Sequence, residues 1–224
     1  RIVVVNSNRM NVLDSIPISE PYNLAMAPTL NTLAVSNKGT NTISFIDTDP
    51  NSVNFHTIIK TSALYDAVNN RTGLGPSEIV WQPDGEDILV VCENSNSLCI
   101  LSNADLDVRK IIPGVAQPRY LCVTDRDIAH GFQTGLYYAY VVQENGQIQV
   151  FESGPDGNQG IGYDDFIGSV IQDGASGFPG ASVIQADPNS AFHGAYLGYS
   201  KNGVGTVAKI FLKSAPTGPR PITL

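Results

Sequence analysis

The chain has 224 residues, only 15% of which are charged, and its formal net charge is −8. Nucleic acid is therefore excluded as a partner, because its phosphates are bound by clustered Lys and Arg side chains. No apolar run approaches the roughly 18 residues of a membrane span, so no span is predicted.

The first predicted elements are two strands, at residues 1–6 and 12–18. Both contain several apolar and β-branched residues, and a polar segment that favours a turn separates them. No further strand precedes residue 21, so this part of the chain provides a pair of strands and no complete sheet.

From residue 21 onward, a proline-led strand recurs four times, each time followed by a hairpin. The four copies begin at Pro21, Pro76, Pro118 and Pro179, at spacings of 55, 42 and 61 residues. A repeat of about 40–45 residues built from four short strands is typical of a β-propeller blade. We therefore predict an all-β fold, with residues 1–224 forming a single β-propeller domain or propeller fragment of four-stranded antiparallel blades that start near these prolines. Residues 1–20 would then be a partial blade.

The strands within the blades follow a common template. The second blade is the clearest, and Pro83-Asp84-Gly85 marks a turn after its first strand. Asn145-Gly146 and Asn202-Gly203 occur at matching places in the third and fourth blades, and each predicts a two-residue type I′ hairpin turn. The other predicted strands cover residues 33–37, 42–47, 53–60, 77–82, 87–93, 97–102, 108–113, 137–144, 147–152, 195–201 and 204–211.

The two ends do not complete a ring. Residues 1–20 provide the third and fourth strands of a blade, and residues 219–224 provide at most one strand. About four and a half blades are visible, and an open arc would expose unpaired strand edges. We therefore expect the chain to be part of a larger, seven-bladed propeller, or to be completed by a protein partner. A five-bladed ring closed by both termini is the alternative.

Two insertions lengthen the repeat. Residues 61–75 contain Leu64, Tyr65 and Val68 at spacings that predict a short helix. Residues 154–177 are rich in Gly, Asp and aromatic residues and predict a loop. Loops on one face of a propeller often form a binding surface, although simple loop growth explains such insertions equally well.

The first two blades contain the pattern of a known family. Residues 76–100 show a Pro, an apolar alternation, Pro-Asp-Gly and a strand that ends near Asn94, and residues 41–47 read Asn-Thr-Ile-Ser-Phe-Ile-Asp. This resembles the YVTN-type β-propeller repeats of surface-layer proteins and the related seven-bladed lactonase-like propellers, over roughly residues 1–215. Residues 90–94 depart from the tetrapeptide that names the family. The resemblance implies an extracellular, periplasmic or cell-surface location, and it provides no catalytic residue.

Candidate ligand-binding residues follow from the positions at which the innermost strands begin, because these line the mouth of a propeller channel. They are Tyr22, Asn23, Glu78, Arg119 and Tyr120. The template places Glu78 and Arg119 on adjacent blades. A carboxylate and a guanidinium that converge there would bind a polar ligand or polarise a carbonyl group. The alternative is an ion pair that fills the channel without any ligand.

No catalytic residue, cofactor or metal site is predicted. Residues 47–51 have the first spacings of a calcium loop, but its glycine and distal glutamate are absent, which favours a solvated turn. His56, His130 and His193 are isolated in sequence. Cys92 and Cys99 lie on opposite sides of a predicted hairpin, so they would form a cross-strand disulfide or remain small buried apolar groups.

These observations predict a non-enzymatic extracellular or cell-surface propeller that acts as a scaffold or binding module, with a protein partner or the remainder of a longer chain bound to it. A lactonase-like hydrolase with its site at the channel mouth is the first alternative. An accessory subunit of a larger redox or surface complex is the second.

Overall fold

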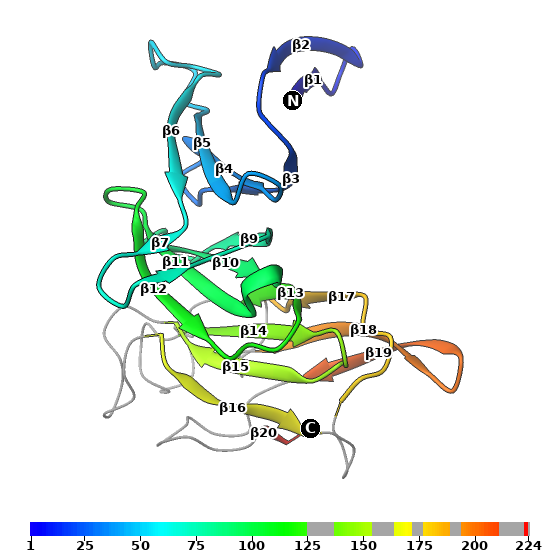
Figure 1. The fold of residues 1–224 in the computed structure, drawn as a ribbon. Helices are drawn as coiled ribbons and strands as arrows, with labels where there is room; N and C mark the ends of the chain where they lie inside the picture. The colour runs from blue at the N-terminus through cyan, green and yellow to red at the C-terminus, as the bar shows by residue number, and fades with distance from the viewer. Residues whose placement is uncertain (125–136, 154–163, 172–176, 189–193, 211–221, 224) are drawn as a thin grey trace. The chain divides into compact units, whose positions relative to one another are not determined.

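The computed structural model describes residues 1–124, 137–153, 164–171, 177–188, 194–210 and 222–223 (Figure 1). Throughout these residues the regular structure is β-strand, apart from the short 3-10 turn η1 (Glu93–Ser95). The chain divides into two compact units, Arg1–Pro113 and Gly114–Leu224. Within the described ranges, no helix is long and apolar enough to cross a membrane.

The first unit contains a hairpin, two four-stranded antiparallel sheets and a small second hairpin (Figure 1). The larger hairpin precedes the first blade, and the small hairpin β7–β8 lies between the two blades in sequence. The elements are β1 (Ile2–Asn6) and β2 (Asn11–Ile16); the first blade β3 (Pro21–Met26), β4 (Thr32–Asn37), β5 (Thr42–Asp47) and β6 (Ile58–Ala63); β7 (Tyr65–Asp66) and β8 (Arg71–Thr72); and the second blade β9 (Pro76–Trp81), β10 (Asp87–Cys92), β11 (Ser97–Ser102) and β12 (Val108–Pro113).

The second unit contains two further sheets. In both, consecutive strands are antiparallel neighbours, while β20 adds to the third blade as a parallel fifth strand. The elements are the third blade β13 (Pro118–Val123), β14 (Tyr138–Gln143), β15 (Ile148–Glu152), β16 (Phe166–Ile171) and β20 (Ile222–Thr223), and the three-stranded sheet β17 (Val183–Ala186), β18 (Ala195–Lys201) and β19 (Val204–Ile210).

The predicted all-β fold with four-stranded antiparallel blades is confirmed. Three innermost strands, β3, β9 and β13, begin at their predicted prolines. The fourth does not, because β17 begins at Val183. Pro179 and Gly180 form a turn instead, in which Gly180 has a φ of +62° and the Pro179 carbonyl accepts the Ser200 N–H at 2.9 Å. Glycine adopts this left-handed conformation without the steric cost that a side chain brings.

The helix predicted within residues 61–75 is wrong. Leu64 is buried, whereas Tyr65 and Val68 are exposed, so the three residues do not form one buried face. Asp66 determines the local structure, because its Oδ1 accepts the backbone N–H groups of Val68 and Asn69, both at 3.0 Å. A side chain that bonds to the backbone in this way favours a turn over a helix. The turn closes the β7–β8 hairpin.

Of the two predicted type I′ turns, one is confirmed. Asn202 and Gly203 both have positive φ, and Lys201 pairs directly with Val204. At the other site only Gly146 has positive φ, at +81°. Its N–H donates to the Gln143 carbonyl, as expected of a type I turn followed by a glycine bulge.

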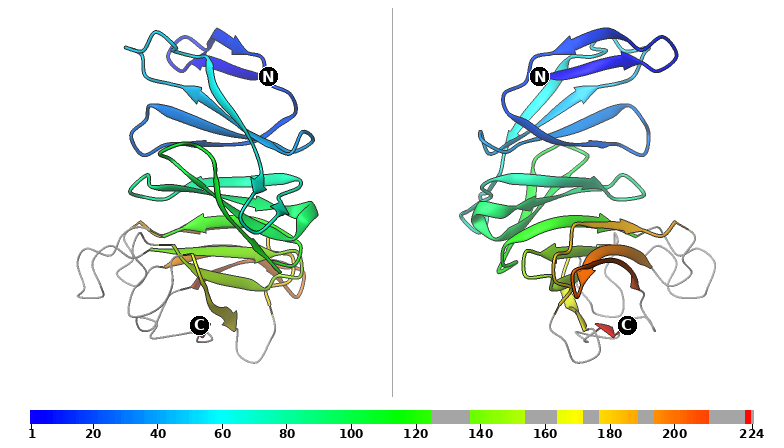
Figure 2. Two further views of the ribbon diagram at one scale, coloured as in Figure 1. Left: turned by 60° about the vertical axis from the view of Figure 1, so that its left-hand side comes forward. Right: turned by 90° about the vertical axis from the view of Figure 1, so that its right-hand side faces the viewer.

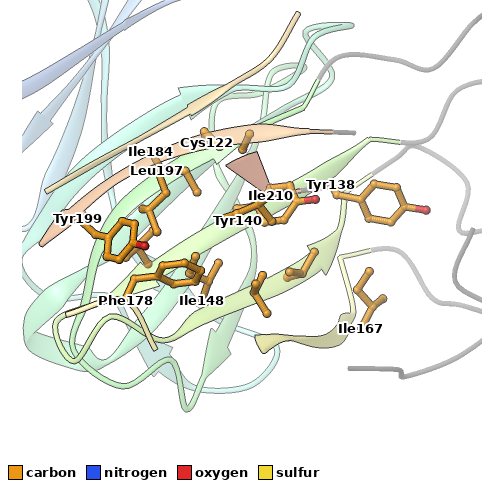
Figure 3. Close-up of a cluster of buried hydrophobic side chains, with 14 residues drawn as sticks. Cys122, Tyr138, Tyr140, Ile148, Ile167, Phe178, Ile184, Leu197, Tyr199 and Ile210 are labelled. Carbon is orange, nitrogen blue, oxygen red and sulfur yellow. The ribbon is translucent and has the colours of Figure 1, made fainter. Parts of the chain in front are cut away.

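The core of each unit lies between neighbouring sheets. In the first unit, the hairpin, the first blade and the second blade are stacked in sequence order (Figure 2). In the second unit, apolar side chains of β14 and β15 face those of β17 and β18 (Figure 3). There the rings of Phe178 and Tyr199 meet edge to face at 5.1 Å between centroids, an arrangement that aromatic rings favour.

Candidate functional site

A β-bulge follows the lead proline in three blades, at the predicted channel-mouth positions. On β3, Pro21 pairs with Asn37 and Asn23 with Ser36, so Tyr22 is the extra residue. Bulges bend a strand and re-aim its side chains, and they are frequent beside active sites. The extra residue on β13 is Arg119, and on β9 it lies within residues 77–78.

A left-handed residue stands immediately before each of these prolines. Glu20, Gly75 and Gln117 have φ values of 49°, 66° and 44°. Positive φ is uncommon for a residue other than glycine, so Glu20 and Gln117 mark a sharp entry into the strand that the surrounding structure holds in place. The positive-φ residue before the proline and the bulge after it form one local motif, which is repeated in three blades. The motif sets the direction of the side chains at the start of the innermost strand.

In the first unit, this motif places Asn23 of β3 beside Glu78 of β9. The Asn23 side chain hydrogen-bonds to the Glu78 carboxyl group. The backbones are joined as well, because the Ser36 hydroxyl accepts the Asn23 N–H at 3.0 Å and donates to the Ser77 carbonyl at 2.7 Å. Asn23 and Glu78 are therefore two predicted site residues that the structure does bring together.

Burial raises the pKa of the half-buried Glu78 carboxyl group. The hydrogen bond from Asn23 lowers it, and the negative charge of Glu93 raises it further. A raised pKa means that a carboxyl group binds a proton more readily than an exposed one does, and the protonated form can donate a hydrogen bond as well as accept one.

Tyr22 belongs to a second set of contacts at the same end of the first unit. The Lys38 ammonium lies 4.4 Å from the centre of the Tyr22 ring and 2.8 Å from the Glu93 carboxylate. The Glu20 carboxylate lies over Gly39, in the space that a Cβ on this residue would occupy. The end of the unit therefore carries three carboxylates, one ammonium group and one exposed aromatic ring.

Sequence reasoning missed Lys38 and Glu93, which follow β4 and β10 and do not start an innermost strand. A signal for them was available in the repeat itself. Asn37 pairs with Pro21 and Cys92 pairs with Pro76, so the residues that follow Asn37 and Cys92 occupy equivalent places in two blades.

The remaining predicted residues lie in the second unit. Arg119 forms an ion pair with Glu144 at 3.2 Å, and both side chains are partly exposed. Tyr120 is half-buried and packs against the core between the two sheets. Convergence of Glu78 and Arg119 on one ligand stays a prediction, since the two residues belong to different compact units.

The described residues contain no group of three or more His, Cys, Asp or Glu side chains arranged to hold a metal ion. The turn at residues 47–51 is closed by its own side chains, with Asp47 accepting the Asp49 N–H and the Ser52 hydroxyl. His56 lies 3.0 Å from the Asp14 carboxylate. His130 and His193 fall outside the described residues.

The fold is shared with solved structures of known proteins. Hydrazine synthase of Kuenenia stuttgartiensis matches 96% of this chain with a TM-score of 0.62 at 14% identity, over 61% of its own length. A protein of unknown function from Desulfotomaculum acetoxidans matches 99% of the chain with a TM-score of 0.61 at 18% identity, over 67% of its length. Dihydro-heme d1 dehydrogenase NirN matches 98% of the chain with a TM-score of 0.58 at 14% identity, over 41% of its length.

At such low identity these similarities show the fold alone, and the fold is that of a β-propeller. No protein-family model and no curated protein matches the sequence. The chain spans less than two thirds of the hydrazine synthase chain that it matches.

Proposed function

We propose that this chain is a non-enzymatic β-propeller module that serves as a scaffold by binding further β-strands along the free edge of β1. The observation that carries the proposal is an uncovered part of the first blade. Leu24 and Met26 on β3 are 49% and 44% exposed, whereas Val35 and Ile46 on the same face of that sheet are completely buried.

The reason for this contrast is that the β1–β2 hairpin covers only the outer part of the blade. Ile16 packs against Val35 and Ile46, together with Ile2 and Val4. No described strand lies over Leu24 and Met26 in the same way. In a complete blade, two more strands would continue the hairpin sheet inward and cover them.

The edge of β1 supports the same conclusion. Among the described strands, β1 pairs with β2 alone, so its other edge has no strand beside it. Unpaired edges are templates for strand addition, and apolar side chains beside such an edge mark a site for another polypeptide. The outer face of the hairpin is apolar as well, with Val3, Val5 and Val12 exposed.

The occupant that fits is a pair of antiparallel strands with alternating apolar residues. It belongs either to the remainder of a longer chain or to a partner protein, and in both cases it completes a blade. An extracellular, periplasmic or cell-surface location is part of the proposal, and it is supported by the resemblance to surface-layer repeats.

The proposal is tested by the native mass and by charged substitutions. We expect native material to have a mass well above the 23.9 kDa of this chain. Met26→Glu should release the additional strands, whereas Val68→Glu, on the exposed tip between β7 and β8, should not. A stable native monomer near 23.9 kDa, with slow amide exchange along β1, would contradict the proposal.

A lactonase-like hydrolase is the second candidate, and the raised pKa of Glu78 is the observation that favours it. A general acid needs such a raised pKa to donate a proton near neutral pH. On this alternative, Glu78→Gln abolishes lactone hydrolysis by the purified protein, while Glu86→Gln leaves it unchanged. Absence of any lactone hydrolysis in the wild-type protein would exclude this candidate.

A further inference from the structure

Two of the three cysteines lie in contact within the second blade. Cys92 ends β10 and Cys99 lies on β11, and their positions are diagonal, since Cys92 pairs with Ser97 and Val90 with Cys99. Because side chains alternate along a strand, both thiols point to the same face of the sheet. Their Sγ atoms are 2.9 Å apart. Carbon atoms in contact are already about 3.5–4.0 Å apart, so two non-bonded sulfurs at this distance are crowded.

The pair is closed off from solvent by the segment that follows β8. Both cysteines are completely buried. A Cβ added to Gly73 would lie 2.5 Å from the Cys99 Sγ and 2.9 Å from the Cys92 Sγ, so the backbone of this residue covers both sulfurs. The Gly73 N–H donates to the Leu64 carbonyl at 2.8 Å, which holds the cover in place.

Burial raises the pKa of the Cys92 thiol well above its ordinary value, and the neighbouring Cys99 raises it further. A buried neutral thiol is a poor nucleophile. Any reaction between the two sulfurs must therefore take place before the cover over them closes, while the chain is folding.

We propose that Cys92 and Cys99 form a disulfide bond that joins β10 to β11 when the chain folds in an oxidising compartment. The oxidant is a small-molecule disulfide such as glutathione disulfide. The Cys92 thiolate displaces one glutathione thiolate and forms a mixed disulfide. The Cys99 thiolate then attacks the protein sulfur of that mixed disulfide and releases the second glutathione. Two thiols lose two protons and two electrons, and one glutathione disulfide becomes two glutathione molecules.

The bond fits the site better than two thiols do. It relieves the contact between the sulfurs and leaves no buried polar S–H group without a strong acceptor. The loop it closes is short, and the cross-link restricts the unfolded chain. This inference is independent of the proposed scaffold function, because it concerns the interior of one blade.

The experiment refolds the full chain from denaturant in glutathione disulfide, removes the glutathione, and labels free thiols with N-ethylmaleimide under denaturing conditions. We expect the wild-type protein to take one label, on Cys122, and to yield a peptide linking Cys92 to Cys99 by mass spectrometry. After reduction it should take three labels, matching its three cysteines. Three labels after oxidative refolding, or a bond that involves Cys122, would overturn the proposal.

Two variants control the measurement. Cys122→Ala should take no label after oxidative refolding and two after reduction, while Cys92→Ser should take two labels under both conditions. The oxidised wild-type protein should also have a melting temperature about 5–10 °C higher than its reduced form. Reductant should not shift the melting temperature of Cys92→Ser. A wild-type melting temperature that reductant leaves unchanged would also count against the bond.

Discussion

A strand of the first blade, β3, and a strand of the second blade, β10, differ in how far their side chains are covered. In the second blade, β10 carries the sequence Asp-Ile-Leu-Val-Val-Cys and every residue is buried. In the first blade, β3 carries Pro-Tyr-Asn-Leu-Ala-Met and every second residue is exposed. Strand β10 lies between two strands of its sheet, whereas β3 lies at an edge, and the β1–β2 hairpin leaves Leu24 and Met26 of β3 exposed.

This difference shows how the pattern of apolar residues in a strand depends on whether one or both of its faces are buried. A strand buried on both faces is apolar without interruption, whereas a strand buried on one face alternates. Yet Tyr22, Leu24 and Met26 lie on the exposed face of β3, and they are not polar residues. The exposed face of β3 is thus apolar, and it is the face that the proposed additional strands would cover.

The largest expected effect on stability comes from removing a buried side chain from the core. Leu89→Ala, in the completely buried β10, should lower the free energy of unfolding by about 2–5 kcal/mol, because it removes buried apolar surface and leaves a cavity. Leu24→Ala is the matched control on the open face of β3, and it should cost less than about 1 kcal/mol. Urea unfolding of both variants measures the difference. Equal losses would show that Leu24 is covered in solution.

A second test uses Asp87, the first residue of β10. Burial raises the pKa of this carboxyl group to about 6, in spite of its hydrogen bonds and ion pair with Arg109. The folded state then holds a proton that the unfolded state releases near pH 4, so stability falls as the pH rises from about 4 to 6. We expect Asp87→Asn to remove this part of the pH dependence.

Between pH 4.5 and pH 7 the expected size of that effect is on the order of 2 kcal/mol or less, because solvent screens part of the shift. It is measured as the difference in unfolding free energy between pH 4.5 and pH 7, for the wild type and Asp87→Asn. Asp107→Asn serves as control, because the Asp107 side chain is 62% exposed. If Asp87→Asn and Asp107→Asn follow the same pH curve, the Asp87 carboxyl group does not titrate in this range.

The third test concerns the outer edge of the second blade. Asp66 of β7 accepts the Ile111 N–H of β12 at 3.2 Å, and Arg71 of β8 donates to the Ile111 carbonyl at 3.0 Å. Burial raises the pKa of Asp66, but its hydrogen bonds from Asn69, Ile111 and Val68 outweigh this and leave the pKa lowered. Asp66→Ala removes the acceptor for all of these donors.

We expect Asp66→Ala to lower the free energy of unfolding by about 1–3 kcal/mol, because buried N–H groups lose their partners. Since the folded-state pKa is lowered, the contribution of Asp66 is present above pH 4 and is lost as the pH falls below it. Asp105→Ala, which removes only a local bond in an exposed turn, is the control. Denaturant titrations at pH 7 that show equal stability for the two variants would contradict this assignment.

The smallest effect is expected where β3 begins. Lys38→Gln removes the ion pair with Glu93 and the contact with the Tyr22 ring, and both are partly exposed. Such contacts contribute up to about 1 kcal/mol, and salt screens them. The loss should therefore shrink when sodium chloride is added to the thermal melt. A larger loss of stability that salt leaves unchanged would mean that solvent does not reach the ion pair at this end of the blade.

The strands of the second blade were predictable because prolines, turns and apolar runs agree there. The predicted strands of the second blade coincide with β9–β12 to within one residue at each end. The bulges were not predictable, because the alternation continues unbroken after the extra residue at Tyr22. The helix predicted around Leu64 is wrong because the prediction used only the spacing of three apolar residues. It left out the hydrogen bonds that the Asp66 side chain accepts from the backbone of Val68 and Asn69. The place of Asn23 and Glu78 in the repeat predicted that both lie at the start of an innermost strand, and their role as ligand-binding residues stays a prediction.

Trp81 provides an optical reporter of the contact between the first two blades. It is the only tryptophan in the sequence, it is buried at the end of β9, and its indole N–H donates to the Ala25 carbonyl of β3 at 2.9 Å. Indole fluorescence shifts to longer wavelength when the ring is hydrated. The emission wavelength of this residue therefore reports whether the first and second blades stay in contact. Far-ultraviolet circular dichroism reports separately whether the strands are still formed. A wavelength shift that precedes the loss of strand signal would identify an intermediate with intact but separated blades.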